Sequence, residues 1–192
     1  MSALISPPAP AASPSPARIT EEAFIARYAG TNAELVDGVV KEQPMPGWLH
    51  GMLSLRIGAM ILAFVEEHDL GRVMSNDSWV RIRPGSFRGG DVLFVSYARL
   101  PKRDAVPEGV HTLAPDLVVE VKSPTDRWGE LFTKVGEYLQ AGVLVVAIVD
   151  PDTRTVSVHR DQGRQHILEE ADALTLPDVL PGFSAPVARL FA

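Results

Sequence analysis

The most informative stretch of the sequence is an apolar segment that ends in two charged residues. The apolar run at 117–119 leads directly into Glu120-Val121-Lys122. Side chains alternate along a strand, so Glu120 and Lys122 would point to the same face of a sheet. Burying these charges without partners is costly, and a hard divalent cation on the carboxylate would offset that cost. With Lys122 orienting or activating a water, the pattern is typical of metal-assisted hydrolysis; a plain ion pair is the alternative.

A second carboxylate for the same chemistry is Asp91. It directly follows Gly89-Gly90 and opens another strand-like apolar run at 92–95. If this run lies beside the segment that carries Glu120, the two carboxylates would meet and share a cation. The alternative is that Asp91 is an ordinary residue at the start of a strand.

The elements that must position these residues are short strands and three helices. Helical spacing of apolar residues predicts the helices, and Asp37-Gly38 predicts a two-residue hairpin turn. This order of elements predicts a fold of mixed helices and strands, α/β (α+β), with a mixed sheet. We expect helices at 20–28, 48–68 and 126–140, strands at 33–36, 39–42, 73–74, 79–82, 92–96, 117–121, 143–149, 155–159 and 165–169, and an extended or short-helical cover at 176–191.

Composition sets further limits on the class of protein. The chain has 192 residues and no cysteine, which excludes disulfides, thiolate zinc sites and cysteine nucleophiles. Residues 1–17 hold five prolines and no charged side chain, so we expect a disordered tail followed by one domain over 18–192. The sequence shows neither a secretory signal nor an uninterrupted apolar run of roughly 18 residues, as a membrane span needs. We therefore expect a cytoplasmic protein without a membrane segment.

Net charge alone argues against nucleic acid as a partner, but the charge is unevenly distributed. The chain carries −6 at pH 7, and affinity for polyanions comes mostly from Lys and Arg. Between residues 72 and 103, seven basic and two acidic residues leave a local charge of +5, so the rest carries −11. Arg81, Arg83 and Arg88 are candidate phosphate contacts, or else solvent-facing residues of a hairpin. The tryptophans are expected to be packing residues rather than platforms for bases: Trp48, Trp79 and Trp128.

Asp91 and Glu120-Val121-Lys122, with 28 residues between them, resemble the Asp…(Asp/Glu)-X-Lys signature of the PD-(D/E)XK nuclease superfamily. The order of the surrounding segments closely resembles the Uma-type restriction-endonuclease family, a branch of that superfamily, over about residues 20–190. The segments that carry the resemblance are Glu34–Val40, a helix beginning near His50, Asp91–Val95, Ala114–Pro124, Lys134–Val143 and Val149–Pro151.

The resemblance implies a fold and a metal site. The fold would be a restriction-endonuclease-like core, in which helices flank a mixed central sheet, with extra hairpins towards both ends of the chain. Asp91, Glu120 and the Val121 carbonyl would hold Mg²⁺ or Mn²⁺. Lys122 would position the attacking water and stabilise the charge that develops on the phosphate.

The resemblance also implies site roles for residues around the two core helices. Glu34 and His50 precede or open the first core helix, where the superfamily often places a further polar active-site residue. Lys134 and Tyr138 are four residues apart, so one face of the second core helix would bring both to the site. The alternatives are an exposed hairpin glutamate, a half-exposed histidine at a helix start, and a tyrosine in the core.

Two positions depart from the expected pattern. Gly90 stands where the superfamily has a proline, which would loosen the approach to Asp91. Lys122 is present although many Uma-type members lack the motif lysine, which favours an intact site in this chain.

The expected function is a Mg²⁺- or Mn²⁺-dependent endonuclease that hydrolyses DNA phosphodiester bonds and acts as a homodimer. One alternative, motivated by the acidic balance outside the basic segment, is a non-catalytic dimeric binding module that keeps the nuclease fold. The other is a metal-dependent phosphodiesterase for a small substrate.

Overall fold

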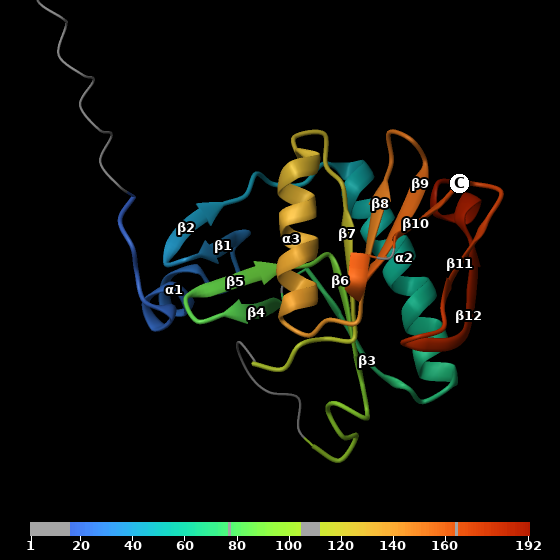
Figure 1. The fold of residues 1–192 in the computed structure, drawn as a ribbon, viewed down its shortest axis with the longest axis horizontal. Helices are drawn as coiled ribbons and strands as arrows, with labels where there is room; N and C mark the ends of the chain where they lie inside the picture. The colour runs from blue at the N-terminus through green and yellow to red at the C-terminus, as the bar shows by residue number, and fades with distance from the viewer. Residues whose placement is uncertain (1–15, 77, 105–111, 164) are drawn as a thin grey trace, which may run out of the picture.

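Figure 1 shows the computed structural model of the chain, which describes residues 16–76, 78–104, 112–163 and 165–192. The predicted tail, residues 1–17, lies outside the described residues except for its last two. Within these ranges a central sheet is flanked by long helices, and a smaller sheet lies beside it. The helices are α1 (Glu21–Tyr28), α2 (Trp48–Glu67) and α3 (Trp128–Gln140).

The central sheet has six strands in the order β10-β9-β8-β7-β6-β3. β7 and β8 run parallel and the other neighbouring pairs are antiparallel, so the prediction of a mixed sheet is confirmed. Parallel neighbours need a long crossover, and α3 provides it. The strands are β3 (Gly71–Ser75), β6 (Val92–Ser96), β7 (Leu117–Val121), β8 (Val145–Asp150), β9 (Thr155–Arg160) and β10 (Gln165–Leu168).

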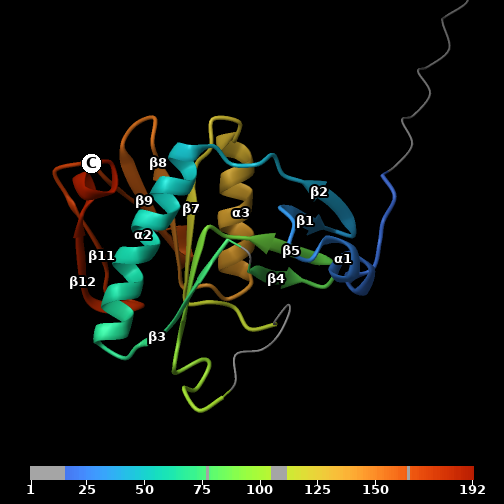
Figure 2. The same cartoon turned by 180° about the vertical axis from the view of Figure 1, so that it is seen from behind.

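α2 and α3 lie on opposite faces of this sheet (Figures 1 and 2). Side-chain alternation along β7 contributes to both faces: Val119 and Val121 join the apolar cluster under α2, and Val118 joins the cluster under α3. Glu120 therefore points towards α3. The cluster under α2 is completed by β11 (Ala173–Leu176), β12 (Leu180–Pro186) and the short 3-10 helix η2 (Val187–Leu190).

α2 buries one of its sides against the sheet. By length and composition alone it could also cross a membrane, although the core helix of a soluble protein passes the same test. The expectation from the sequence concerned uninterrupted apolar runs, and α2 is not one, because His50, Ser54 and Arg56 interrupt it. The buried residues recur every four positions, as the inward face of a helix requires: Leu53, Ile57, Ile61 and Val65.

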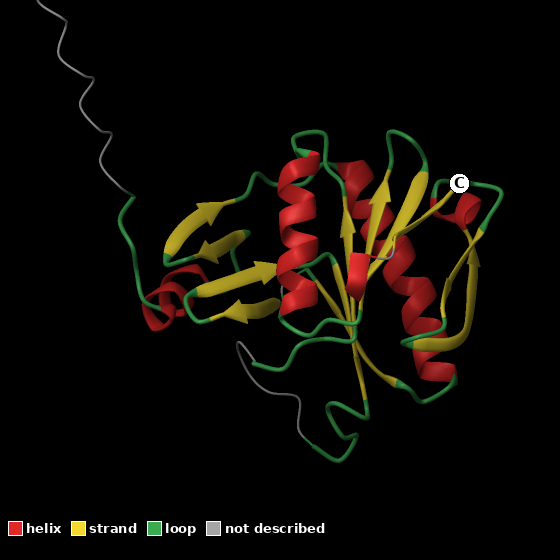
Figure 3. Ribbon diagram, in the orientation of Figure 1, coloured by secondary structure: helices red, strands yellow, loops and turns green. Residues whose placement is uncertain are grey.

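The smaller sheet has four strands in the order β2-β1-β5-β4 (Figure 3). α1 packs against it through Phe24, which is fully buried in a cluster with Leu35 and Phe87. The predicted turn at Asp37-Gly38 is confirmed, since these residues have positive φ angles of 50° and 79°. The strands are β1 (Ala33–Val36), β2 (Val39–Glu42), β4 (Trp79–Arg83) and β5 (Ser86–Gly89).

β5 and the hairpin β11–β12 are strands that the sequence pattern did not predict. β5 reads Ser-Phe-Arg-Gly, and its Arg88 is buried. A glycine and a charged residue weaken the strand signal, because that signal cannot register a partner that buries the charge. The C-terminal segment was expected as an extended or short-helical cover, and β12 and η2 do cover the α2 side of the core.

Candidate active site

One cavity brings together most of the residues that were predicted to carry chemistry. It has a volume of about 270 Å³ and is lined by segments that are far apart in the sequence. Lys122 is not among the described residues that line it. The predicted residues in its lining are Glu34 in β1, His50 in α2, Asp91 before β6, Glu120 and Val121 in β7, and Lys134 in α3.

Asp91 is held in place at the start of β6. Its backbone N–H donates to the Val119 carbonyl at 2.9 Å, and its Oδ2 accepts the N–H of Val121 at 2.6 Å. The same oxygen lies 3.2 Å from Nε2 of His50. Among the described residues both side-chain contacts use Oδ2, so Oδ1 is the oxygen that remains for a ligand.

Gly90, which was expected to loosen the approach to Asp91, occupies a closely packed position. A Cβ at position 90 would lie 2.7 Å from Cγ1 of Val118 and 2.8 Å from Cδ2 of Leu93. Real Cβ atoms essentially never make contacts this short, and a proline would bring its Cβ to the same place. Glycine therefore stands here because the neighbouring core side chains fill the space that a proline would need.

His50 lies in the first turn of α2 and faces Asp91. Burial acts to lower the pKa of the imidazole, but the hydrogen bond to Asp91 and the negative charge of that carboxylate outweigh burial, so the pKa is raised. The contact with the Asp91 carboxylate therefore favours the protonated form of the ring. With its side chain 12% exposed, His50 is part of the cavity wall rather than a half-exposed residue at a helix start.

Glu120 is buried, and α3 contacts both of its carboxylate oxygens. The Tyr138 hydroxyl donates to Oε1 at 2.7 Å, and Nζ of Lys134 lies 3.5 Å from Oε2. Burial raises the pKa of Glu120 to about 7; the positive charge of Lys134 opposes this rise and the negative charge of Asp91 adds to it. One face of α3 thus brings Lys134 and Tyr138 to Glu120, as their spacing predicts.

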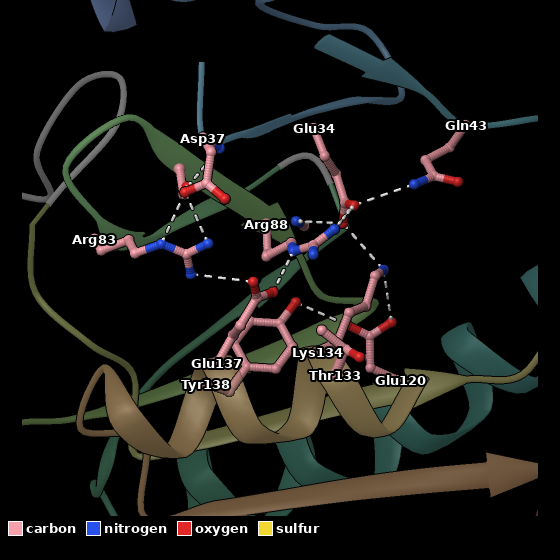
Figure 4. A network of polar contacts seen from close by, with 12 residues as sticks. Glu34, Asp37, Gln43, Arg83, Arg88, Glu120, Thr133, Lys134, Glu137 and Tyr138 are labelled. Atoms are coloured by element: carbon pink, nitrogen blue, oxygen red, sulfur yellow. Dashed lines mark hydrogen bonds and ion pairs between the residues drawn. The ribbon is translucent and has the colours of Figure 1, made fainter. Parts of the chain in front are cut away.

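Lys134 belongs to a chain of ion pairs that reaches the smaller sheet (Figure 4). Oε1 of Glu34 lies 3.0 Å from Nζ of Lys134, and its Oε2 lies 2.7 Å from Nη1 of Arg88. Nε of Arg88 in turn lies 2.7 Å from Oε2 of Glu137. Burial acts to raise the pKa of Glu34, but the positive charges of Lys134 and Arg88 outweigh it, so the pKa is lowered. Glu34 is a buried, ionised residue of the site rather than an exposed hairpin glutamate.

Arg81, Arg83 and Arg88 do not form a free basic edge. Nη2 of Arg81 lies 3.0 Å from Glu21, and Nη2 of Arg83 lies 2.9 Å from Asp37. Arg88 is buried, so it is not a solvent-facing hairpin residue either. Each of the three guanidinium groups contacts a carboxylate, so none of them is left unpaired for a phosphate, contrary to the expectation.

Lys122 lies outside the cavity, contrary to the prediction from the motif. Its ammonium group contacts the carboxylate of Asp152 and lies 3.7 Å from Oδ1 of Asp150. The hydrogen bond to Asp152 raises the pKa of Lys122. β7 ends one residue earlier, and beyond it Lys122 lies beside acidic residues at the end of β8. The amine that reaches Glu120 is that of Lys134 instead.

Two residues of the site were missed by sequence reasoning. Glu137 binds Arg88, and the side-chain amide of Gln43 donates to Oε2 of Glu34 at 3.1 Å. Glu137 follows Lys134 by three positions, and this helical spacing would have placed it on the same face. Nothing in the sequence marks Gln43, because its partner lies across the hairpin.

The oxygen ligands of the cavity fit a hard divalent cation. Asp91 and Glu120 provide carboxylates and Val121 a carbonyl, the oxygen ligands that Mg²⁺ and Mn²⁺ prefer. Glu120 is buried within the field of the Asp91 charge, so a cation would stabilise both. The described part of the chain holds no group of three or more His, Asp or Glu side chains ready to bind a metal, and water would complete the coordination.

The comparisons with known proteins show the family and the fold of the chain. The profile of the Uma2 family, described as "Putative restriction endonuclease", matches residues 21–188. A solved structure, "a putative nuclease belonging to DUF820" from Anabaena variabilis ATCC 29413, is similar with a TM-score of 0.79 and 20% identity, covering 90% of this chain and 97% of its own. At this identity the likeness shows a shared fold, and no curated protein matches. Because the profile matches most of the chain, this protein belongs to the Uma2 family of putative restriction endonucleases.

Proposed function

We propose that this protein is a metal-dependent endonuclease that hydrolyses phosphodiester bonds of DNA in the cavity described above. The convergence of Asp91, Glu120 and Lys134 on that cavity carries the proposal. Membership of the Uma2 family supports the nuclease class. The metal is inferred from the oxygen ligands, and the DNA substrate from the class.

Asp91, Glu120 and the Val121 carbonyl would hold Mg²⁺ or Mn²⁺. When bound, such a cation lowers the pKa of a coordinated water and neutralises charge on a phosphate oxygen. His50 would act as a positioning residue, because its contact with Oδ2 of Asp91 keeps that carboxylate oriented.

Lys134, rather than Lys122, would provide the ammonium group that the motif requires. Its Nζ lies between Glu120, at 3.5 Å, and Glu34, at 3.0 Å, and it lines the cavity. A fixed positive charge there can orient the attacking water and stabilise negative charge that develops on the phosphate. Glu34 would hold the Lys134 side chain in that position.

A second cavity beside the first offers a path for a longer substrate. It has a volume of about 410 Å³, and both cavities are lined by Gln43, Asp126 and Lys134. Lys41 also lines it, and among the described ion pairs Lys41 has no carboxylate partner, so it can meet a phosphate. Among the described lysines and arginines that line the two cavities, Lys41 is the one without a carboxylate partner, so affinity for DNA should be modest and should fall with added salt.

Cleavage of a supercoiled plasmid in the presence of Mn²⁺ or Mg²⁺ tests this proposal. Lys134→Met should lower the rate at least about 100-fold, the usual effect of removing a group that stabilises the transition state. Lys122→Met is the matched control and should change the rate only a few-fold. Asp91→Asn should abolish cleavage, and calorimetric titration should show Mn²⁺ binding that Glu120→Gln removes.

Two results would overturn the proposal. If the wild type and Asp91→Asn show the same trace activity and no Mn²⁺ binds, the chain is a binding module. If Lys122→Met is inactive and Lys134→Met is active, the lysine assignment is wrong.

A metal-dependent phosphodiesterase for a small substrate is the second candidate. The pairing of Arg81, Arg83 and Arg88 with carboxylates favours it, because a polyanion then loses its most obvious binding edge. Hydrolysis of a chromogenic phosphodiester without cleavage of DNA would select this candidate.

A further inference from the structure

α2 carries an apolar stripe on the side that faces away from the sheet. Trp48 is 97% exposed, Leu55 74%, Met52 43% and Leu62 40%, and the expectation that Trp48 is a packing residue is therefore wrong. Figure 2 shows α2 in front of the sheet, and no described helix or strand covers its outer side. A contiguous apolar surface of this kind usually marks an interaction site.

The spacing of the stripe is that of a coiled-coil seam. Its members alternate steps of four and three residues, as the a and d positions of a heptad do. The one basic residue in this part of the helix, Arg56, is turned aside, since its Nη1 donates to the Leu190 carbonyl at 2.8 Å. The seam consists of Trp48, Met52, Leu55, Ala59, Leu62 and, at its end, Glu66.

We propose that this stripe binds a second copy of the chain, with the two α2 helices antiparallel. The two-fold axis would pass near position 57, so that Leu55 of one copy lies opposite Ala59 of the other. Met52 then lies opposite Leu62, and Trp48 opposite Glu66. Each layer pairs an a position with a d position, and the large Leu55 meets the small Ala59, so the stripe is complementary to itself.

The charges at the ends of α2 favour the antiparallel direction. A helix is stabilised by acidic residues at its N-terminus and basic residues at its C-terminus. α2 has the reverse: no acidic residue in its first turn, no capping side chain at Gly47, and no basic residue in its last turn. Antiparallel pairing brings Glu66 and Glu67 of each copy to the N-terminus of the other, which remedies both ends.

The exposed apolar area of the stripe makes up more than half of a standard dimer contact. With about 150–250 Å² for a large side chain, the exposed fractions of Trp48, Met52, Leu55 and Leu62 amount to an area on the order of 500 Å² per copy. A standard interface buries about 800 Å² per partner. The stripe thus accounts for most of such an interface before its alanines and flanking residues are counted.

The proposed dimer also places the two cavities. Gly47 and His50 line the cavity, and Trp48 lies between them in the sequence, so each cavity would lie at one end of the seam. The two copies of Trp48 would be about 27 Å apart along the seam, at 1.5 Å per residue. The dimer itself does not depend on the proposed nuclease activity.

Sedimentation velocity of the full chain at micromolar concentration tests the interface. The wild type should sediment as a dimer, and Leu55→Glu as a monomer. Ile167→Glu is the matched control, because Ile167 is 63% exposed but lies on β10, and it should remain dimeric. A monomeric wild type, a dimeric Leu55→Glu or a monomeric Ile167→Glu would each overturn the proposal. Binding to a membrane is the competing explanation. If the wild-type chain pellets with phosphatidylglycerol vesicles and Leu55→Glu does not, the stripe binds lipid and the proposal is also overturned.

Cysteine cross-linking tests the direction of the helices, and it covers the case in which Leu55→Glu fails to fold. The chain has no cysteine of its own. Met52→Cys and Leu62→Cys chains, mixed, left to exchange and mildly oxidised, should form a disulfide-linked dimer. Met52→Cys alone should not, because its two copies would lie about 15 Å apart, beyond the roughly 7 Å limit between Cα atoms. Cross-linking of Met52→Cys alone would mean a parallel arrangement and would refute the proposal.

Discussion

The two faces of the central sheet are built from the same strands, but one face is apolar and the other carries buried charges. Under α2 the buried cluster is apolar, and the one ion pair that α2 makes among the described residues is that of His50 with Asp91, in its first turn. Under α3 the apolar cluster gives way to buried charges, and each of Glu34, Arg88, Glu120 and Lys134 contacts an opposite charge. A single strand, β7, contributes Val119 and Val121 to the first face and Glu120 to the second.

The difference teaches how a buried site can be charged without unfolding the domain. Ionised groups are costly to bury unless paired, and here the partners come from β1, β5, β7 and α3. The apolar face needs only the hydrophobic periodicity of its own elements. The polar face needs several distant segments to be in place at once, and it should therefore respond more sharply to substitution.

The largest effect is expected from removing the central cation of the polar face. Arg88→Met leaves the carboxylates of Glu34 and Glu137 without their shared partner, and should cost about 4 kcal/mol of unfolding free energy, as breaking a buried ion pair does. Urea denaturation measures it. Arg81→Met, which removes a more exposed ion pair with Glu21, is the control and should cost less than about 1 kcal/mol. Equal losses in the two variants would contradict the contrast.

A slightly smaller effect is expected on the apolar face. Ile57→Ala leaves a cavity between α2 and the sheet and should cost about 3 kcal/mol. The same urea titration measures it, and the plasmid cleavage rate below the unfolding transition should stay at the wild-type level. A loss of cleavage in well-folded Ile57→Ala would show that the two faces are coupled.

An intermediate effect is expected where the apolar and charged parts of the α3 face meet. Tyr138→Phe removes the hydrogen bond to Oε1 of Glu120 and keeps the ring, and should cost about 2 kcal/mol, as for a hydrogen bond to a charged group. Thermal unfolding followed by circular dichroism measures it. A Tyr138→Phe variant more stable than the wild type would mean that the hydroxyl destabilises the folded state.

The smallest effect is a pH dependence from His159 on β9, at the far end of the α3 face. Burial lowers the pKa of this imidazole, so the folded state favours the neutral ring. The neutral His159 ring therefore contributes fully to the free energy of unfolding above the ordinary histidine pKa of about 6.5. As the pH falls below that value this contribution is lost, by at most about 1.4 kcal/mol per pH unit. His159→Gln should flatten the dependence of unfolding free energy on pH between 7 and 5; an unchanged slope in the variant would contradict this assignment.

Much of the apolar framework could be predicted from the sequence. The alternation around Glu120, the helical spacing in α2 and the Asp37-Gly38 turn are local signals, and local signals are what a sequence pattern records. The meeting of Asp91 with Glu120 also followed, because each residue lies in or beside a strongly apolar strand.

The charged partners could not be predicted in the same way. Lys122 has the right spacing from Glu120, but spacing cannot reveal that the parallel neighbour β8 ends in Asp150, with Asp152 just beyond, to pair with it. Arg88 seemed a surface residue because its strand was not recognised and its partners lie about 50 residues away on either side. Long-range pairing of charges leaves no period in the sequence.

Gly90 has a consequence for the residues that position 90 can accept. A Cβ there would lie 2.7 Å from Cγ1 of Val118 and 2.8 Å from Cδ2 of Leu93, so any other residue requires these side chains to shift. A smaller residue at 118 or 93 would make room, but each would leave a void and reduce stability on its own. The tolerance of position 90 is thus set by two core residues, and substitutions at these three positions should not be additive.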